Sequence, residues 1–199
     1  MRTDTVIPRY SFAKTFTVTY PDRREWKKRN IHILGNGPVL YTDGSKTSSF
    51  TGEGVFGDKT GLVFSLDAFE AVFQAEVFAR MAAICESIAR GYNGRTSTIF
   101  TESQAALKAL ESVTVKFKLV LECLECLSEL ATHNSVQLVW HEGILGSERA
   151  DELAKKCVDT PLTRPEPVLG LPYSMVKRAI GDWMDRKHTE CWKSGKDAL

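Results

Sequence analysis

Three short apolar runs follow one another between residues 39 and 66, and glycine-containing segments separate them. Runs of this length and spacing predict three antiparallel strands. A helical pattern over residues 71–92 comes directly after them, because its apolar residues recur at intervals of three and four and stop at Gly91 and Gly94. Strands that need a helix to cover one face favour an α/β layered fold. The three strands are expected at Val39–Asp43, Gly54–Gly57 and Leu62–Leu66.

The rest of the chain continues this alternation of strands and helices. Residues 96–101 and 136–140 are short apolar runs typical of strands, whereas residues 103–110, 116–131 and 148–158 have helical spacing. The expected order of elements is therefore βββαβααβα. We expect an α/β fold with a five-stranded mixed sheet flanked by helices.

Length and composition predict one globular domain inside the cell. The chain has 199 residues, 43% of them hydrophobic, which suits one globular domain with flanking arms. No run of about 18 apolar residues occurs, and the segment after Met1 lacks the apolar core of a secretory signal. Five cysteines, an odd number, favour free thiols in a reducing compartment. We therefore expect an intracellular protein of the nucleus or cytoplasm with no membrane span.

The net charge of +1 hides an uneven distribution along the chain. Residues 1–37 carry eight Lys or Arg against three Asp or Glu, and residues 161–199 carry seven against five. The segment between them carries eleven against seventeen. An acidic centre with basic flanks suggests metal chemistry in the middle and arms that help to hold a polyanion. Ordinary solvated surface charge explains the arms equally well.

Four of the central acids lie on four different predicted elements. They stand within the first strand, on the first helix, at the end of the fourth strand and on the last helix. Hard divalent cations such as Mg²⁺ prefer oxygen ligands, so carboxylates that converge from several elements make a metal site. Each acid by itself is weak evidence, because most acidic side chains are simply solvated. The four candidates are Asp43, Glu76, Glu102 and Asp151.

The sequence around each of these acids resembles a signature block of the ribonuclease H family. The blocks are residues 41–46 (YTDGSK), 72–76 (VFQAE), 101–107 (TESQAAL) and 146–155 (GSERADELAK). They occur in the family's order and on the elements that the family requires. More narrowly, they resemble the ribonuclease H domain of jockey-like non-long-terminal-repeat retrotransposons, which follows a reverse transcriptase. The resemblance covers about residues 38–160.

The resemblance implies an endonuclease that hydrolyses the RNA strand of an RNA–DNA hybrid during reverse transcription. In this interpretation residues 38–160 form the nuclease domain, residues 1–37 a basic linker arm after the polymerase, and residues 161–199 a C-terminal tail with a helix. The implied partners are the hybrid and a reverse transcriptase domain in the same polypeptide. The implied cofactor is a pair of Mg²⁺ ions, with Mn²⁺ as a substitute, held by Asp43, Glu76, Glu102 and Asp151.

Further roles carried over from the family concern the substrate and the proton. Gly44 and Ser45 match a position where backbone and hydroxyl approach the hybrid, and a glycine there allows close approach. His141 matches a loop histidine that assists proton transfer or product release. The chain departs from the family at Glu102, where Asp is usual, and in the loop after Trp140, which is shorter.

The segment Cys123-Leu-Glu-Cys126 has the spacing of a metal or redox motif. It lies in the middle of a predicted helix, and no second Cys-x-x-Cys pair accompanies it. We therefore interpret both cysteines as core residues.

Three functions from different classes fit these observations. The first is an active metal-dependent nuclease, and we prefer it because all four acidic positions remain acidic. The second is a decayed domain that still folds and binds hybrids or braces a polymerase, with Glu102 and the shortened loop as marks of decay. A transposase or integrase on a related fold is weaker, because the acid on the last helix lies in the hydrolase-like block at residues 148–151.

Overall fold

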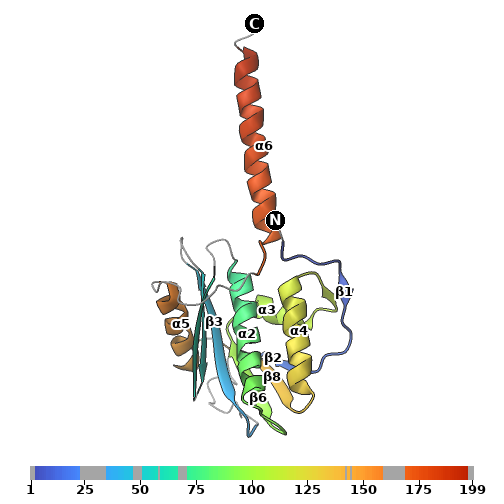
Figure 1. Ribbon diagram of the computed structural model, residues 1–199, viewed down its shortest axis with the longest axis vertical. Helices are drawn as coiled ribbons and strands as arrows, with labels where there is room; N and C mark the ends of the chain where they lie inside the picture. The colour runs from blue at the N-terminus through green and yellow to red at the C-terminus, as the bar shows by residue number, and fades with distance from the viewer. Residues whose placement is uncertain are drawn as a thin grey trace.

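The computed structural model describes residues 3–22, 35–46, 51–57, 59–66, 71–141, 143, 145–158 and 169–196. Its main feature is a six-stranded sheet with the strand order β2-β8-β6-β3-β4-β5 (Figure 1). In chain order the strands are β2 (Thr17–Thr19), β3 (Val39–Lys46), β4 (Thr51–Gly57), β5 (Thr60–Leu66), β6 (Thr96–Thr101) and β8 (Ser135–Trp140).

The sheet is mixed. β3, β4 and β5 pair antiparallel, as their short turns require, whereas β6 pairs parallel with β3 and with β8. The predicted α/β class with a mixed sheet flanked by helices is confirmed. The prediction of five strands was one short, because β2 adds to β8 in parallel. A three-residue strand with mostly exposed side chains carries no alternation that the sequence could reveal.

Helices cover both faces of the sheet (Figure 1). The long helix α2 and its neighbours α3 and α4 lie on one face, and α5 lies on the other. Two parallel strands of one sheet are joined by a crossover connection, usually a helix. This explains why α2 precedes β6, and why α3 and α4 lie between β6 and β8. The helices are α2 (Val72–Ala89), α3 (Gln104–Glu111), α4 (Lys118–Ala131), α5 (Leu145–Val158) and α6 (Tyr173–Lys196).

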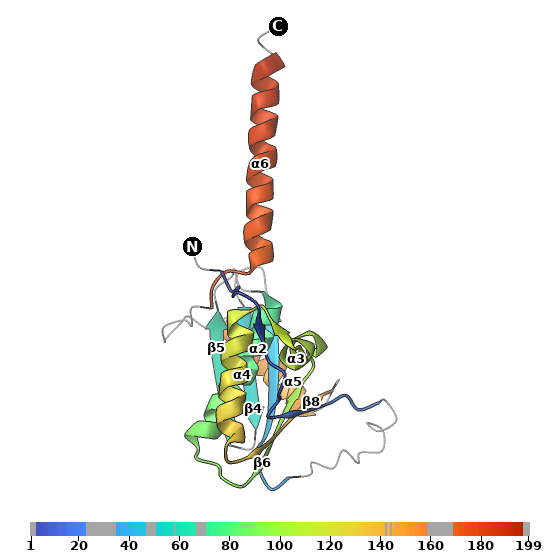
Figure 2. The ribbon, with the colours of Figure 1, turned by 90° about the vertical axis from the view of Figure 1, so that its right-hand side faces the viewer.

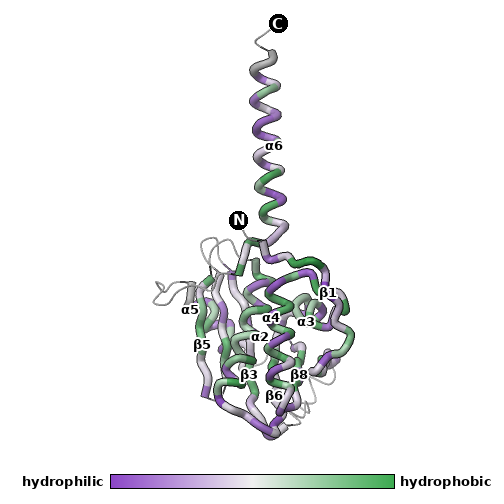
Figure 3. The backbone as a smooth tube through the Cα atoms, turned by 45° about the vertical axis from the view of Figure 1, so that its right-hand side comes forward, coloured by the Kyte–Doolittle hydropathy of each residue, from purple (hydrophilic) through white to green (hydrophobic). Residues whose placement is uncertain are grey.

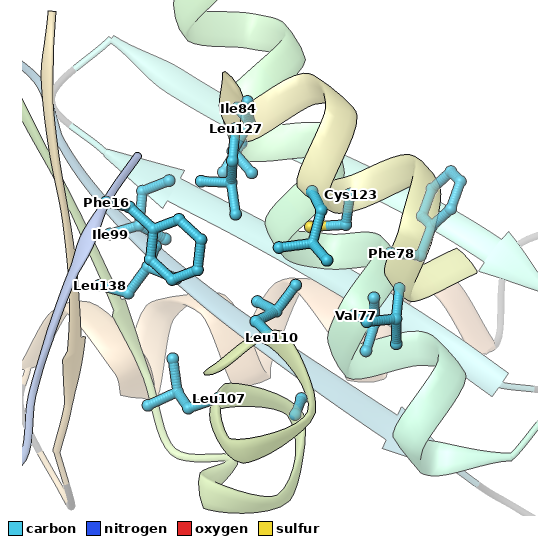
Figure 4. Packing of buried hydrophobic residues seen from close by; sticks show 14 of the residues in the cluster. Phe16, Val77, Phe78, Ile84, Ile99, Leu107, Leu110, Cys123, Leu127 and Leu138 are labelled. Atoms are coloured by element: carbon cyan, nitrogen blue, oxygen red, sulfur yellow. The ribbon is translucent and has the colours of Figure 1, made fainter. Parts of the chain in front are cut away.

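The apolar core fills the space between the sheet and the α2–α4 side (Figure 4). Helix α4 contributes Leu127, strand β6 contributes Ile99, and strand β8 contributes Leu138, all of them buried. Phe16, just before β2, belongs to the same cluster. The segment predicted to be an arm thus supplies a strand and a core residue to the domain.

The beginning of the chain also joins several elements through Asp4. This side chain is 2% exposed; its Oδ1 accepts from the Leu119 amide at 3.0 Å and its Oδ2 from Gln74 Nε2 at 3.3 Å. The Asp4 amide donates to the carbonyl of Leu171 at 3.0 Å. Burial raises the pKa of Asp4. Nearby, strand β1 (Arg9–Tyr10) pairs with β7 (Thr114–Val115). Residues 3–22 are therefore held at many points to the rest of the domain.

Helix α6 stands away from the body of the molecule (Figures 1 and 2). Hydrophobic and hydrophilic residues alternate along it (Figure 3). Its apolar side chains are largely exposed, Trp183 at 55% and Trp192 at 64%. Among the described residues, no helix combines the length and apolar character that a bilayer-spanning helix needs.

The packing of α5 on the sheet generates the first prediction. A Cβ at Gly54 of β4 would collide with the Ala150 carbonyl and stand 2.9 Å from the Ala154 amide, whereas a Cβ at Gly61 of β5 would meet nothing within 4 Å. We expect Gly54→Ala to lower the free energy of unfolding in urea by about 1–3 kcal/mol. Gly61→Ala, the matched control, should leave it unchanged or raise it slightly. Equal losses for the two variants would contradict this account of α5 packing.

Candidate active site

Asp43 lies in the middle of the sheet, on the strand that joins its two halves. On one side it pairs with Gly54 of β4, and on the other side Thr42 pairs with Thr101, the last residue of β6. The residues after that last pair are Asp43 and Glu102, so parallel pairing brings their backbones side by side. The sequence alone placed both acids on strands, but only the strand order makes them neighbours.

Asp151 reaches the same region because α5 rests on the sheet. The helix approaches β4 at Gly54, directly opposite Asp43, through Ala150 and Ala154. The three small residues let the helix and strand backbones come close, and Asp151 is the next residue along the helix. Asp151 is half-buried there.

Glu76 comes from the opposite face, on the second turn of α2. Gly44 makes its approach possible, since a Cβ there would lie 3.0 Å from the Glu76 amide nitrogen. The Gly44 amide also donates to the Glu76 carboxylate, which lowers the pKa of Glu76, although burial raises it more strongly. Gln74 fixes the start of the helix by accepting from the Ala71 amide at 3.0 Å. Ser45, the other residue predicted to contact substrate, is half-buried in β3 opposite Gly52.

The other three predicted acids influence the electrostatics of Asp43. Burial raises the pKa of Asp43 to about 8, and the carboxylates of Glu76, Asp151 and Glu102 add to this rise in that order. A carboxylate among carboxylates resists ionisation because like charges repel. A divalent cation would offset this concentration of negative charge, and the oxygen donors suit a hard ion such as Mg²⁺.

The described residues nevertheless contain no group of three or more His, Cys, Asp or Glu side chains that could hold a metal ion as they stand. Each of the three acids other than Asp43 has a donor of its own. Arg80 binds Glu76 Oε2 at 3.4 Å, and Lys155 Nζ binds Asp151 Oδ2 at 2.5 Å. Glu102 is exposed, and its Oε1 accepts from the Gly143 amide at 3.1 Å.

Arg80 is the residue that sequence analysis missed. It is fully buried on α2 and donates to the Glu76 carbonyl at 2.5 Å, to the Thr101 hydroxyl and to the Ser103 carbonyl at 3.4 Å. Burial lowers its pKa. It thereby joins the helix that carries Glu76 to the turn that carries Glu102. Loss of one partner of a buried pair like this costs about 3–5 kcal/mol. A basic residue four positions after Glu76, within an apolar helix, was the available signal.

His141 is buried beside the start of α5. Its side chain is fully buried, and its Nε2 lies 2.7 Å from the Ser147 hydroxyl. Its ring packs edge-on against Tyr41 and Phe100, with ring centroids 6.1 and 5.4 Å away. Burial lowers the pKa of His141 to about 4, which favours a neutral imidazole. The role in proton transfer or product release stays a prediction.

No protein-family model and no curated protein matches this chain. The function is therefore inferred from the geometry of the site and from the four motif blocks. Together they indicate three acids, from three other elements, around Asp43.

The raised pKa of Asp43 predicts how stability depends on pH. The folded state holds the Asp43 proton more tightly than the unfolded chain, whose Asp has a pKa near 3.8. Without metal, the free energy of unfolding should therefore fall as pH rises from about 4 to about 8. Asp43→Asn should flatten this fall and be the more stable protein at pH 8. Urea unfolding across this range measures it, with Glu125→Gln on the exposed side of α4 as the control. An unchanged slope in Asp43→Asn would refute the assignment.

Proposed function

We propose that this chain is a metal-dependent endonuclease of the ribonuclease H type, which hydrolyses the RNA strand of RNA–DNA hybrids. The observation that carries the proposal is the gathering of Glu76, Glu102 and Asp151 around Asp43, on the strand, helix and sheet positions that the motif resemblance requires. The mixed sheet with helices on both faces is compatible with the ribonuclease H fold.

Each acid has a distinct part in this proposal. Asp43, Glu76, Glu102 and Asp151 would hold the metal. Two Mg²⁺ ions bound there would activate a water and stabilise the leaving oxygen of the phosphodiester. Arg80 keeps Glu76 in place from the buried side, and Asp151 would exchange its ion pair with the exposed Lys155 for the metal.

The hybrid would be held mainly by charge. On α4, Lys118 is paired with Glu122 at 3.1 Å, so this helix offers little free positive charge. Affinity then depends on other basic segments or on a reverse transcriptase domain in the same polypeptide, and it falls with added salt. We propose that the chain works within such a retrotransposon polyprotein, inside the cell, where template RNA is removed after copying.

A decayed, hybrid-binding domain is the second candidate. Two observations support it. The Glu102 side chain is exposed and accepts a hydrogen bond from the Gly143 amide, and the His141 side chain is fully buried. Such a domain would bind the hybrid without cutting it.

Hybrid cleavage by the purified chain tests the proposal. We expect Mg²⁺-dependent cleavage of the RNA strand of a labelled hybrid, with no cleavage of double-stranded DNA. Asp43→Asn should abolish it while keeping the fold, because the variant loses a metal ligand without a change of volume. Glu125→Gln should cut like the native chain. Binding without cleavage by the native chain would favour the decayed domain, and cleavage by Asp43→Asn would defeat the nuclease assignment.

Glu102 supplies a prediction about rate. Its side chain is one methylene longer than Asp, and an error of about 1 Å at a catalytic centre can cost ~10²-fold in rate. The shorter side chain of Glu102→Asp would also weaken the hydrogen bond that the carboxylate accepts from the Gly143 amide. The carboxylate would then be free to approach Asp43. We expect faster single-turnover cleavage and a lower Mn²⁺ requirement, with unchanged hybrid affinity. Glu125→Asp is the matched control. A rate no higher than native would show that the backbone already fits the longer side chain.

A further inference from the structure

Helix α6 carries an apolar stripe that the described part of the chain leaves largely uncovered. The helix extends away from the sheet and from the other helices (Figures 1 and 2). Tyr173, Ile180 and Trp183 each expose more than half of their surface, and Met184 beside them does the same. A helix in water gains most of its stability by packing such a face against another element. The exposed stripe therefore indicates a docking surface.

The stripe has the spacing of a coiled-coil seam. Its residues follow one another at alternating intervals of three and four, as the two core positions of a seven-residue repeat do. The apolar seam residues are Tyr173, Val176, Ile180 and Trp183. Lys187 and Glu190 continue the same spacing, and Lys187 Nζ binds Glu190 Oε2 at 2.7 Å. A stripe confined to these positions is the narrow seam by which one helix packs on another.

The positions that flank this seam carry positive charge. Lys177, Arg186 and Lys193 occupy flanking positions, their side chains are exposed, and none of them forms an ion pair with a described residue. Asp182 and Asp185 fall on the far side of the helix. Flanking charges determine which partner a seam accepts. A second copy of α6 would offer these cations no acid, because the flanking positions between residues 173 and 193 contain no Asp or Glu.

We propose that the seam of α6 docks on an amphipathic helix of a partner protein whose flanking positions are acidic. Trp183 and its apolar neighbours would pack against the apolar seam of the partner, and the basic flanks would pair with its acids. The charged residues at the end of the seam, Lys187 and Glu190, would favour one register of the two helices. The proposal does not depend on the nuclease function, since none of these residues belongs to the candidate active site.

Binding of two designed peptides to the full chain tests this proposal. Both peptides are helices with the same seam of Ile and Leu; one has Glu at every flanking position and the other has Lys. Each carries a fluorescent label, and its anisotropy is followed as the protein is added. We expect the Glu peptide to bind at least about tenfold more tightly at low salt, and added salt to reduce the difference because it screens the flanking charges.

Two tryptophans on the same helix provide matched variants. Trp183 is a seam residue and Trp192 is not, and both are exposed, so glutamine at either position should leave the domain folded. Trp183→Gln should weaken binding of the Glu peptide by about tenfold or more, whereas Trp192→Gln should leave it nearly unchanged. Lys177→Glu combined with Arg186→Glu should reverse the preference toward the Lys peptide. Circular dichroism checks that each variant keeps its helix content.

Four outcomes would overturn the proposal. The first is no binding of either peptide, and the second is equal binding of both peptides or equal losses in the two tryptophan variants, which would show unspecific apolar adhesion. The third is a dimer of the native chain in sedimentation velocity that Trp183→Gln abolishes, which would assign the seam to a second copy. The fourth is binding to vesicles of phosphatidylserine and phosphatidylcholine without binding to the Glu peptide, which would assign the seam to a membrane surface.

Discussion

The contact between α5 and β4 is the constraint on which the candidate site depends. Gly54 lies beneath Ala150 and Ala154, and the absence of side chains larger than a methyl lets two backbones touch. Because Gly54 pairs with Asp43, this contact brings Asp151 to the central strand. Gly44 does the same on the other face, where it admits the start of α2 and Glu76. Two glycines on neighbouring strands therefore determine how closely acids from opposite layers can approach.

Bringing like charges together has an electrostatic cost, and the protein offsets it locally. Arg80 binds Glu76 from the buried side, Lys155 binds Asp151 from the exposed side, and the Gly143 amide binds Glu102. Burial raises the pKa of Asp43 most strongly, and the neighbouring carboxylates of Glu76, Asp151 and Glu102 add to the rise.

Helix α2 contacts the sheet, the beginning of the chain and α4. Its first turns present Glu76 to the sheet and hold the beginning of the chain through Gln74 and Asp4. The same helix also packs on α4.

The sequence by itself determined the elements and the chemistry of the acids. Strands and helices with clear apolar periods appeared within a few residues of their predicted bounds, because periodicity reports which face of an element is buried. Asp43, Glu76, Glu102 and Asp151 were chosen by motif, and the carboxylates of the last three raise the pKa of Asp43 further. Strand β2 was missed, because pairing of three mostly exposed residues depends on a distant neighbour, β8. The burial of His141 and the contacts of Arg80 were decided by the tertiary structure alone, because each depends on segments far apart in the chain.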